Sequence, residues 1–233
     1  MGNEQVILIA GAGGSVGRTL AKAVLQRGYQ AALAFRNPAH EQELQQMMQP
    51  YHTRMQLYRA DLADEAEAAQ LRQRVLQAFG RVDVVVNAAG GWIGGKKLHE
   101  HTAEEFRSML DMDLRPTFHL MHQFLEVMSR QKQGKFIQFA SAAVFGPGAG
   151  SAVYAASKAG VLALCRAAAE EYRNRGVSVF ALAPSIIDTE KNRKAMPGAD
   201  HRSWVRIEDI VRLVLYLIEN GEALSGTVFH LSG

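Results

Sequence analysis

Cysteine is nearly absent from this sequence: Cys165 is the only one among 233 residues. A single cysteine cannot form a disulfide within the chain and cannot supply a cysteine-rich zinc site. This excludes the small disulfide-stabilised secreted scaffolds and favours a cytoplasmic protein. Proline is also scarce, with six residues, and no stretch is rich in proline or serine, low in complexity or repeated. Without a visible linker, we expect one domain over residues 1–233.

Long apolar runs are missing as well. The longest, such as Val82–Val86 with Asp83 inside it, falls far short of a membrane span. Residues 1–5 lack the charged start and apolar stretch of a signal peptide. Val6 stands where N-myristoylation of Gly2 needs serine or threonine. We therefore expect no association with a membrane.

No block of like charge occurs. The formal net charge is +3, and the basic residues are spread along the chain apart from a modest cluster between Lys191 and Arg206. Because there is no Lys/Arg block and no recognised nucleic-acid motif, we expect no nucleic-acid partner. A mildly basic pocket is better suited to a small molecule that carries phosphate.

What the sequence does contain is a regular alternation of short apolar runs and amphipathic stretches. Hydrophobic residues make up 48% of the chain, enough for a sizeable core. The pattern predicts strands at Val6–Ala10, Ala31–Phe35, Met55–Tyr58, Val84–Val86, Phe136–Phe139, Val177–Leu182 and Gly226–Leu231. It predicts helices at Ser15–Arg27, Glu41–Gln49, Asp64–Phe79, Ala103–Arg130, Tyr154–Arg175 and Ile207–Glu219. Buried strands alternating with helices indicate an α/β fold: a Rossmann-type, doubly wound parallel sheet with helices on both faces.

A glycine-rich segment, Gly11-Ala-Gly-Gly-Ser-Val-Gly17, follows the first predicted strand and opens the first helix. Glycines there let the backbone approach a pyrophosphate, and the helix N-terminus supplies N–H groups and positive potential. The segment therefore predicts dinucleotide binding. It also matches G-x-S-x-G, the nucleophile pattern of hydrolases, with Ser15 as nucleophile. That pattern needs an earlier strand and loop for the oxyanion hole, and only one strand precedes Ser15, so dinucleotide binding is favoured.

Tyr154 and Lys158 lie four residues apart in the stretch YAASK, so a helix places them on one face. A phenol ordinarily has a pKa of about 10 and is a poor proton donor near neutral pH. A neighbouring ammonium favours the phenolate, by roughly 4 kcal/mol at about 4 Å and an effective dielectric of about 20. The pair therefore indicates a general acid. An exposed Tyr and Lys on a surface helix would show the same spacing.

Together these segments resemble the short-chain dehydrogenase/reductase family over the full length of the chain. The matching motifs follow the family's order: AGAGGSVG (10–17), Asp61-Leu62 after the third strand, NAAG (87–90) after the fourth, Ser141 after the fifth, YAASK (154–158), and Pro184 with Thr189 after the sixth. Ser141 precedes Tyr154 by thirteen residues, which also fits the family. The resemblance implies an NAD(P)-dependent oxidoreductase.

The resemblance also implies residue roles. Tyr154 is expected to donate the proton, Lys158 to favour its ionisation and to bind the nicotinamide ribose, and Ser141 to hydrogen-bond the reacting oxygen. Contacts with the cofactor are expected from Gly11, Ser15, Val16, Gly17, Arg36, Asp61, Leu62, Asn87, Ala88, Gly90, Tyr154, Lys158, Pro184 and Thr189.

Several of these residues also have simpler structural explanations. A serine at a strand end, such as Ser141, can cap a turn. Thr189 can equally cap a short helix, and Asn87 can merely tie strands together. Asp61 can be an N-cap, although Asp64 fits that role better.

Arg36 follows the second predicted strand, at the point where NAD-binding proteins of this fold carry an acidic residue that binds the ribose hydroxyl. Phe35 occupies the position of that acid. A guanidinium matches phosphate oxygens bidentately. We therefore expect NADP(H) in preference to NAD(H), with an arginine exposed in a solvated loop as the alternative.

Two stretches resemble, more narrowly, quinonoid dihydropteridine reductase and its bacterial relatives: AGGWIGG (89–95) and DTEKNRKAMPGADHRSW (188–204). The second lies in the family's substrate loop, at about 184–205. Trp92 and Trp204, the only tryptophans, lie in these stretches. We expect them to stack on a flat substrate, unless they only pack their loops down.

Three positions depart from the family pattern. Ser15 and Ser185 each replace a glycine, and Asp113 stands where the family usually has an active-site asparagine. That asparagine helps to hold a water in the proton relay. An aspartate can also hold a water, but its charge would alter Lys158. Ser141, which dihydropteridine reductase lacks, is retained.

The predicted function is an NADPH-dependent reductase that acts on a small molecule. It would transfer hydride to a ketone carbonyl or a conjugated imine, with Tyr154 as general acid. Two alternatives stay open: a 3-oxoacyl thioester reductase of the same family, and a non-catalytic NADP(H)-sensing protein.

Metal binding is not expected. His99 with His101, and His119 with His122, have spacings that permit ligation, but no cysteine ligand lies nearby. Relatives form dimers or tetramers through the helix that here carries Ala155–Ala169. The resemblance therefore implies a homodimer or homotetramer.

Overall fold

A computed structural model describes residues 4–233, and within them seven strands form one sheet. The strands are β1 (Val6–Ala10), β2 (Gln30–Phe35), β3 (Met55–Arg59), β4 (Val84–Asn87), β5 (Gly134–Phe139), β6 (Val177–Pro184) and β7 (Val228–Leu231). They lie in the order β3-β2-β1-β4-β5-β6-β7, and every neighbouring pair is parallel. The predicted Rossmann-type sheet is confirmed.

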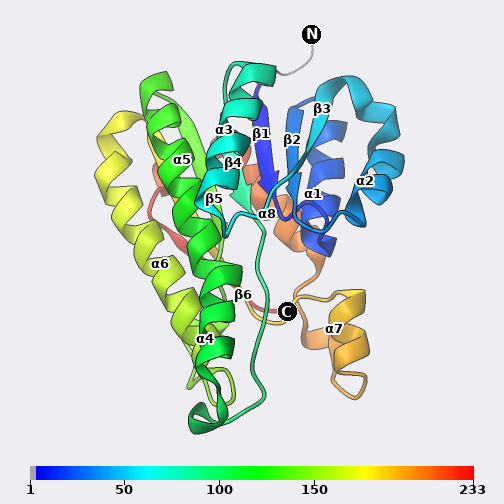
Figure 1. The fold of residues 1–233 in the computed structure, drawn as a ribbon, viewed down its shortest axis with the longest axis vertical. Helices are drawn as coiled ribbons and strands as arrows, with labels where there is room; N and C mark the ends of the chain where they lie inside the picture. The colour runs from blue at the N-terminus through cyan, green and yellow to red at the C-terminus, as the bar shows by residue number, and fades with distance from the viewer. Residues whose placement is uncertain (1–3) are drawn as a thin grey trace.

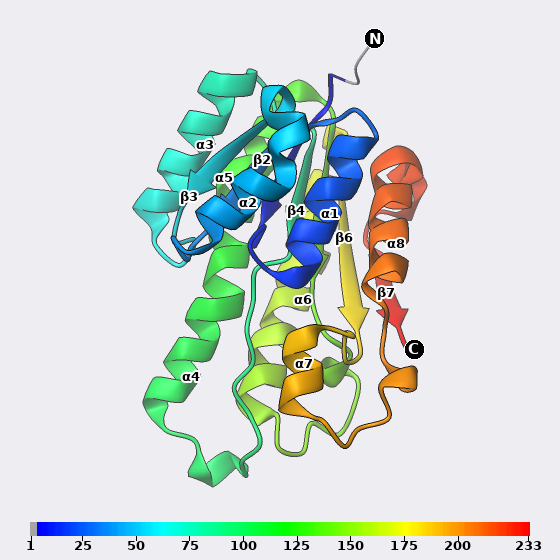
Figure 2. The ribbon, with the colours of Figure 1, turned by 90° about the vertical axis from the view of Figure 1, so that its right-hand side faces the viewer.

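Helices cover both faces of the sheet, as Figures 1 and 2 show. On one face lie α1 (Ser15–Gln26), α2 (His40–Met48) and α8 (Ile207–Asn220). On the other lie α3 (Glu65–Phe79), α5 (Arg115–Gln131) and α6 (Ala152–Tyr172). Two further helices, α4 (Ala103–Met109) and α7 (Glu190–Ala195), extend beyond these layers at the carboxyl ends of the strands. Short 3₁₀ segments lie at Gln49–Arg54, Leu98–Glu100, Ala142–Val144, Arg173–Arg175, His201–Ser203 and Glu222–Leu224.

The strands are apolar throughout because the sheet is buried on both faces. In β1, Leu8 and Ala10 join the core beneath α3, α5 and α6, whereas Ile7 and Ile9 join the core beneath α1, α2 and α8. All four are fully buried. Successive side chains of a strand point to opposite faces, so an uninterrupted apolar run feeds two cores at once.

Two helical features differ from the prediction. The stretch predicted as one helix, Ala103–Arg130, contains a π-helical segment at Leu110–Leu114 between α4 and α5. The wider π turn breaks the 3.6-residue pattern just before Pro116, which lacks a backbone N–H and begins α5 with Arg115. The sequence predicts α7 only through the alternative that Thr189 caps a short helix. The Thr189 hydroxyl does cap α7, because it accepts from the N–H of Asn192 at 3.1 Å.

Residues Ala152–Arg175 are long and apolar enough to cross a membrane by length and composition alone, with a mean hydropathy of 1.2. A search for uninterrupted apolar runs overlooks this segment because Lys158 and Arg166 divide it. In the structure its buried apolar residues between Val161 and Ala169 belong to the core on one face of the sheet. A core helix of a globular domain passes the same test, so the segment is weak evidence for a span.

A buried carboxylate ties the amino ends of three strands together. Asp83 is 2% exposed and lies just before β4. One of its oxygens accepts from the N–H of Val6 at 2.8 Å, and the Arg81 guanidinium binds both oxygens. The backbone N–H of Asp83 donates to the carbonyl of Val6, and the carbonyl of Asp83 accepts from the N–H of Lys135, at 2.9 Å each. The carboxylate raises the pKa of Arg81 through these hydrogen bonds.

We predict that Asp83→Ala lowers the free energy of unfolding by about 3 kcal/mol, because it leaves a buried N–H unpaired and removes the partner of Arg81. Urea denaturation followed by circular dichroism measures the change. Arg107→Ala is the control, since it breaks an ion pair in which both side chains are exposed and should leave stability unchanged. A loss in Asp83→Ala no larger than in the control would contradict this role.

Candidate active site

A cleft of about 500 Å³ lies at the carboxyl ends of β1 to β4. The chain fills one half of the sheet with β2 and β3 and then returns to place β4 on the other side of β1. The loops after β1 and β4 therefore diverge, which opens a crevice between them. The lining residues are Gly11, Gly13, Gly14, Ser15, Arg18, Ala34, Phe35, Arg36, Asn37, His40, Ala60, Asp61, Leu62, Ala88, Ala89, Gly90, Asp111, Met112, Pro116 and Lys191.

The predicted cofactor contacts divide into two groups. Gly11, Ser15, Arg36, Asp61, Leu62, Ala88 and Gly90 line this cleft. Val16, Gly17, Asn87, Tyr154, Lys158, Pro184 and Thr189 do not. Sequence reasoning missed Arg18, His40, Met112, Pro116 and Lys191. These residues lie on helices, and only tertiary packing determines which side of a helix faces the cleft.

Two positions of the glycine-rich loop, which forms the floor of the cleft, admit only glycine. Gly11 has a φ of +78°, and a Cβ there would lie 2.6 Å from the backbone N of Ala89. A Cβ on Gly17 would lie 2.2 Å from the carbonyl oxygen of Gly11. No side chain caps α1, whose N-cap residue is Gly14. The first N–H groups of α1 therefore remain available for an anion.

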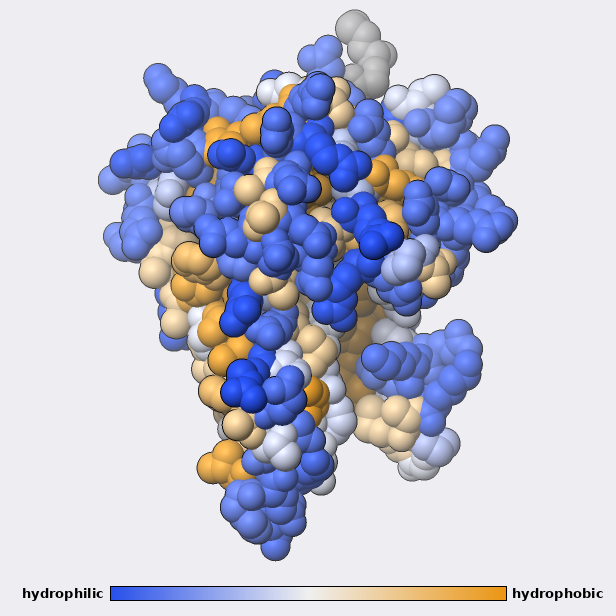
Figure 3. All heavy atoms as spheres, viewed as in Figure 1, coloured by the Kyte–Doolittle hydropathy of each residue, from blue (hydrophilic) through white to orange (hydrophobic). Residues whose placement is uncertain are grey.

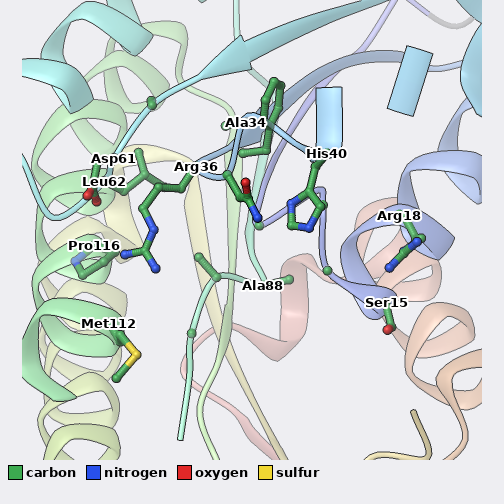
Figure 4. Close-up of a pocket in the computed structure, with 18 of the residues that line it drawn as sticks. Ser15, Arg18, Ala34, Arg36, His40, Asp61, Leu62, Ala88, Met112 and Pro116 are labelled. Atoms are coloured by element: carbon green, nitrogen blue, oxygen red, sulfur yellow. The ribbon is translucent and has the colours of Figure 1, made fainter. Parts of the chain in front are cut away.

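Basic side chains lie along the side of the cleft formed after β2. Figure 4 shows Arg36 and His40 pointing into the pocket from that side, with Arg18 on α1 opposite. The His40 ring packs against the glycine-rich loop, since a Cβ on Gly13 would lie 2.0 Å from its Nδ1. Arg18 is paired with Glu43. Arg36 is exposed and forms no ion pair within residues 4–233, so its charge is free to meet a ligand.

The loop after β3 is fixed by hydrogen bonds from two helices. The carboxylate of Glu67 accepts from the backbone N–H of Asp61 at 2.8 Å, and the buried His119 ring bonds the carbonyl of Leu62 at 2.8 Å. Asp64 caps α3 by accepting from the N–H of Glu67 at 2.9 Å. Asp61 is therefore not the N-cap, and its carboxylate accepts only the nearby N–H of Ala63 at 3.0 Å among described residues.

Asn87 ties strands together at the end of β4. Its amide donates to Gln138 of β5 at 2.9 Å and its oxygen accepts from the N–H of Ala89 at 3.1 Å. The side chain is fully buried and lies behind the cleft wall. It therefore shapes the loop of Ala88 and Gly90, which do line the cleft.

A buried ion pair joins the π-helical segment to α6. The Asp113 side chain, on a residue 1% exposed, places Oδ1 3.2 Å from Lys158 Nζ and 3.1 Å from the backbone N of Gly91. Its Oδ2 lies 3.0 Å from the Ser157 hydroxyl, whose single proton is shared with the Tyr154 carbonyl at 2.8 Å. Lys158 also donates to the carbonyl of Phe139 at 3.2 Å. Both charges are therefore satisfied inside the protein.

Tyr154 lies beside this pair and is not among the residues that line the cleft. Lys158 Nζ is 5.9 Å from the centroid of the half-buried Tyr154 ring. A Cβ on Gly90, which lines the cleft, would be 3.2 Å from the same Nζ. Ser141 is buried at the end of β5, and its hydroxyl accepts from the N–H of Ala143 at 3.2 Å. The predicted turn cap at Ser141 is therefore present, and its O–H remains able to donate.

The two tryptophans differ in exposure. Trp92 is 58% exposed, in the loop after β4. Trp204 is 4% exposed, and its ring centroid lies 4.4 Å from that of His201. Trp204 packs its own loop down, because burial leaves no ring face for a substrate in this structure. Of the two, only Trp92 keeps surface that a flat molecule could contact.

The fold and this cleft define an NAD(P)-dependent oxidoreductase of the dehydrogenase/reductase type. Residues 5–199 match the model of the short chain dehydrogenase family. The chain belongs to that family.

Relatives agree with this assignment. An uncharacterised oxidoreductase of Staphylococcus epidermidis is 28% identical over 215 residues, covering 92% of this chain and 91% of the relative. One from Staphylococcus aureus strain MW2 is 26% identical over the same coverage. Among solved structures, ElxO with NADP bound has a TM-score of 0.91 at 23% identity, covering 97% of this chain and 96% of ElxO. An NAD⁺-bound xylitol dehydrogenase has a TM-score of 0.89 at 21% identity, covering 99% and 98%. These structures share the fold.

We predict that Gly11→Ala weakens binding of the nicotinamide cofactor at least tenfold, because the new Cβ meets the backbone of the opposite loop. Gly80→Ala is the matched control: Gly80 has a φ of +74° but no atom within 4 Å of the added Cβ. Both variants carry the strain of a left-handed residue, of about 1 kcal/mol. Fluorescence titration with NADPH should separate them, and equal affinities would contradict the close approach.

Proposed function

We propose that this protein is an NADPH-dependent reductase that transfers hydride to a ketone carbonyl or a conjugated imine, with Tyr154 as general acid. The observation that best supports it is the Lys158 ammonium, which lies beside the half-buried Tyr154 ring and behind Gly90 of the cleft. A cation there favours the phenolate, which makes the phenol a usable donor. Ser141 would hydrogen-bond the reacting oxygen.

The cleft fits a dinucleotide. The glycine-rich floor and the uncapped start of α1 suit a pyrophosphate, held by the N–H groups of Ser15, Val16 and Gly17. Asp61 and Leu62 would hold the adenine end, and Gly90, Lys158 and Thr189 the nicotinamide end. When bound, the reduced nicotinamide supplies the hydride.

Arg36 supports NADP(H) as the preferred cofactor. Its guanidinium points into the cleft without an acidic partner, and Phe35 replaces the acid that would select NAD(H). Relatives of known structure include both NADP- and NAD⁺-bound proteins. The preference therefore depends on Arg36 in this chain.

Apolar side chains follow the carboxyl ends of three strands. Trp92 follows β4, Phe145 follows β5 and Ile186 follows β6, and all three are exposed. Figure 3 shows the surface hollowed between the projecting end near α4 and the segment that carries α7, with apolar surface inside the hollow. These features favour a flat or apolar substrate, and we propose that residues 184–205 act as its loop.

Two substrate types fit this surface. The stretches 89–95 and 188–204 favour a quinonoid dihydropterin through their resemblance to dihydropteridine reductase. A 3-oxoacyl thioester is the second candidate, since a putative 3-oxoacyl-reductase from Bacillus thuringiensis has the same fold, with a TM-score of 0.86 at 22% identity.

We also propose a homodimer or homotetramer that assembles through α6. Ala156, Ala159, Ala163 and Ala167 are exposed along one face of this helix. Small side chains there would let the helix of a second copy approach closely. Light scattering coupled to gel filtration would give the oligomeric state.

We predict that Tyr154→Phe lowers kcat for reduction at least a hundredfold without weakening NADPH binding, since only the proton donor is removed. The substrate for this assay comes from a screen of NADPH oxidation with ketones, 3-oxoacyl thioesters and quinonoid dihydropterin. Tyr51→Phe, remote from the cleft lining, should leave the rate unchanged. A fully active Tyr154→Phe would exclude the proposed acid, and NADPH binding with no turnover would favour a sensor.

We predict that Arg36→Asp weakens NADPH binding at least thirtyfold and leaves NADH binding within threefold, because it removes the phosphate partner and adds a like charge. Calorimetric titration with each cofactor measures both constants. Arg72→Asp makes the same charge change on the exposed side of α3 and controls for net charge. Equal losses for the two cofactors would count against Arg36 as the selective residue.

A further inference from the structure

The buried Asp113–Lys158 pair has a consequence for the acid. We propose that Asp113 is a positioning residue that partly neutralises Lys158 and thereby keeps Tyr154 protonated, and active in reduction, to higher pH. This inference rests on the proposed function, in which Tyr154 donates the proton.

The geometry fixes a direct ion pair. Asp113 Oδ1 lies 3.2 Å from Lys158 Nζ, and the two side chains are 0% and 5% exposed. The other contacts hold the carboxylate in place: Oδ1 accepts from the N–H of Gly91, and Oδ2 shares the Ser157 hydroxyl with the Tyr154 carbonyl. A carboxylate with three donors and no solvent stays fixed beside the ammonium, so its charge acts continuously on Lys158.

Few other charges face the pair. From α6, the ionisable neighbours of Lys158 are Tyr154 and Cys165, and burial raises the pKa of Cys165 to about 12, which leaves a neutral thiol. From β5 the contact is the carbonyl of Phe139, and from the loop after β4 it is a backbone N–H. Asp111, on the same π-helical segment, is paired with Arg115. Asp113 is therefore the carboxylate that balances Lys158.

The effect on Tyr154 follows from Coulomb's law. A lone ammonium stabilises a nearby phenolate, and a carboxylate in contact with that ammonium opposes this stabilisation. Removing the negative charge should therefore favour the phenolate. Reduction needs the phenol, so the pH above which its rate falls should move down. Alcohol oxidation needs the phenolate, so the pH at which its rate rises should also move down.

The test is Asp113→Asn, which keeps the shape and the hydrogen-bonding oxygen but removes the charge. In this variant, kcat for reduction should begin to fall at a pH about one unit lower than in the wild type. The pH at which alcohol oxidation begins should move down by the same amount. KM should change less than twofold, because the amide oxygen still accepts from Gly91. Asp113→Ser, also uncharged, should give the same shift and serves if the amide variant does not fold.

Ser157→Ala is the matched control. It removes one hydrogen bond to Asp113 and keeps the charge, so its pH profile should match the wild type even if its rate falls. Carbon-13 NMR of ring-labelled tyrosine, assigned with Tyr154→Phe, follows ionisation of the same phenol without turnover. This readout separates the inference from the proposed function, because it needs no substrate.

The outcomes are distinct. An acid shift in both uncharged variants, absent in Ser157→Ala, supports the inference. Unchanged pH and NMR profiles in Asp113→Asn and Asp113→Ser overturn it while leaving Tyr154 as the acid. A shifted NMR profile in a protein that reduces nothing would support the ion-pair effect and reject the proposed function.

Discussion

The structure depends on one constraint, the growth of a parallel sheet in both directions from β1. Parallel neighbours need crossover connections, and these place helices on both faces. The change of side between β3 and β4 parts the loops at the carboxyl ends and opens the cleft. Each strand end then delivers one part of the site: a glycine-rich floor after β1, an arginine after β2, Asp61 after β3 and the Asn87–Gly91 turn after β4.

Most of this fold could be predicted, because the periodicity of apolar residues and the residues that end helices and strands determine it. The bounds of β1 were predicted to the residue, and Asp64 was identified as the cap of α3. The π-helical segment escaped prediction because its residues, Leu110–Leu114, keep an ordinary helical composition. Pro116, two residues beyond it, marks a break in the helix but does not specify a π turn.

The site was predictable where local spacing carries the chemistry and not where packing decides it. Tyr154 and Lys158 needed only four residues of helix to come together, and the glycine-rich loop needed only its place after a strand. The direct pairing of Asp113 with Lys158 depends on how the π-helical segment packs against α6, which no local pattern records. Trp204 shows the same limit, since its burial, with 4% of its surface exposed, follows from tertiary packing that the sequence does not reveal.

Cys165 offers a consequence of the way α6 is seated. It lies seven residues after Lys158, two turns along the same helix, and faces the core. With its thiol buried and neutral, an alkylating reagent reaches it when α6 lifts away from the sheet or when the whole domain unfolds. The chain's sole sulfhydryl is thus an intrinsic reporter: its alkylation rate measures how often the helix carrying Tyr154 and Lys158 opens, with no label added.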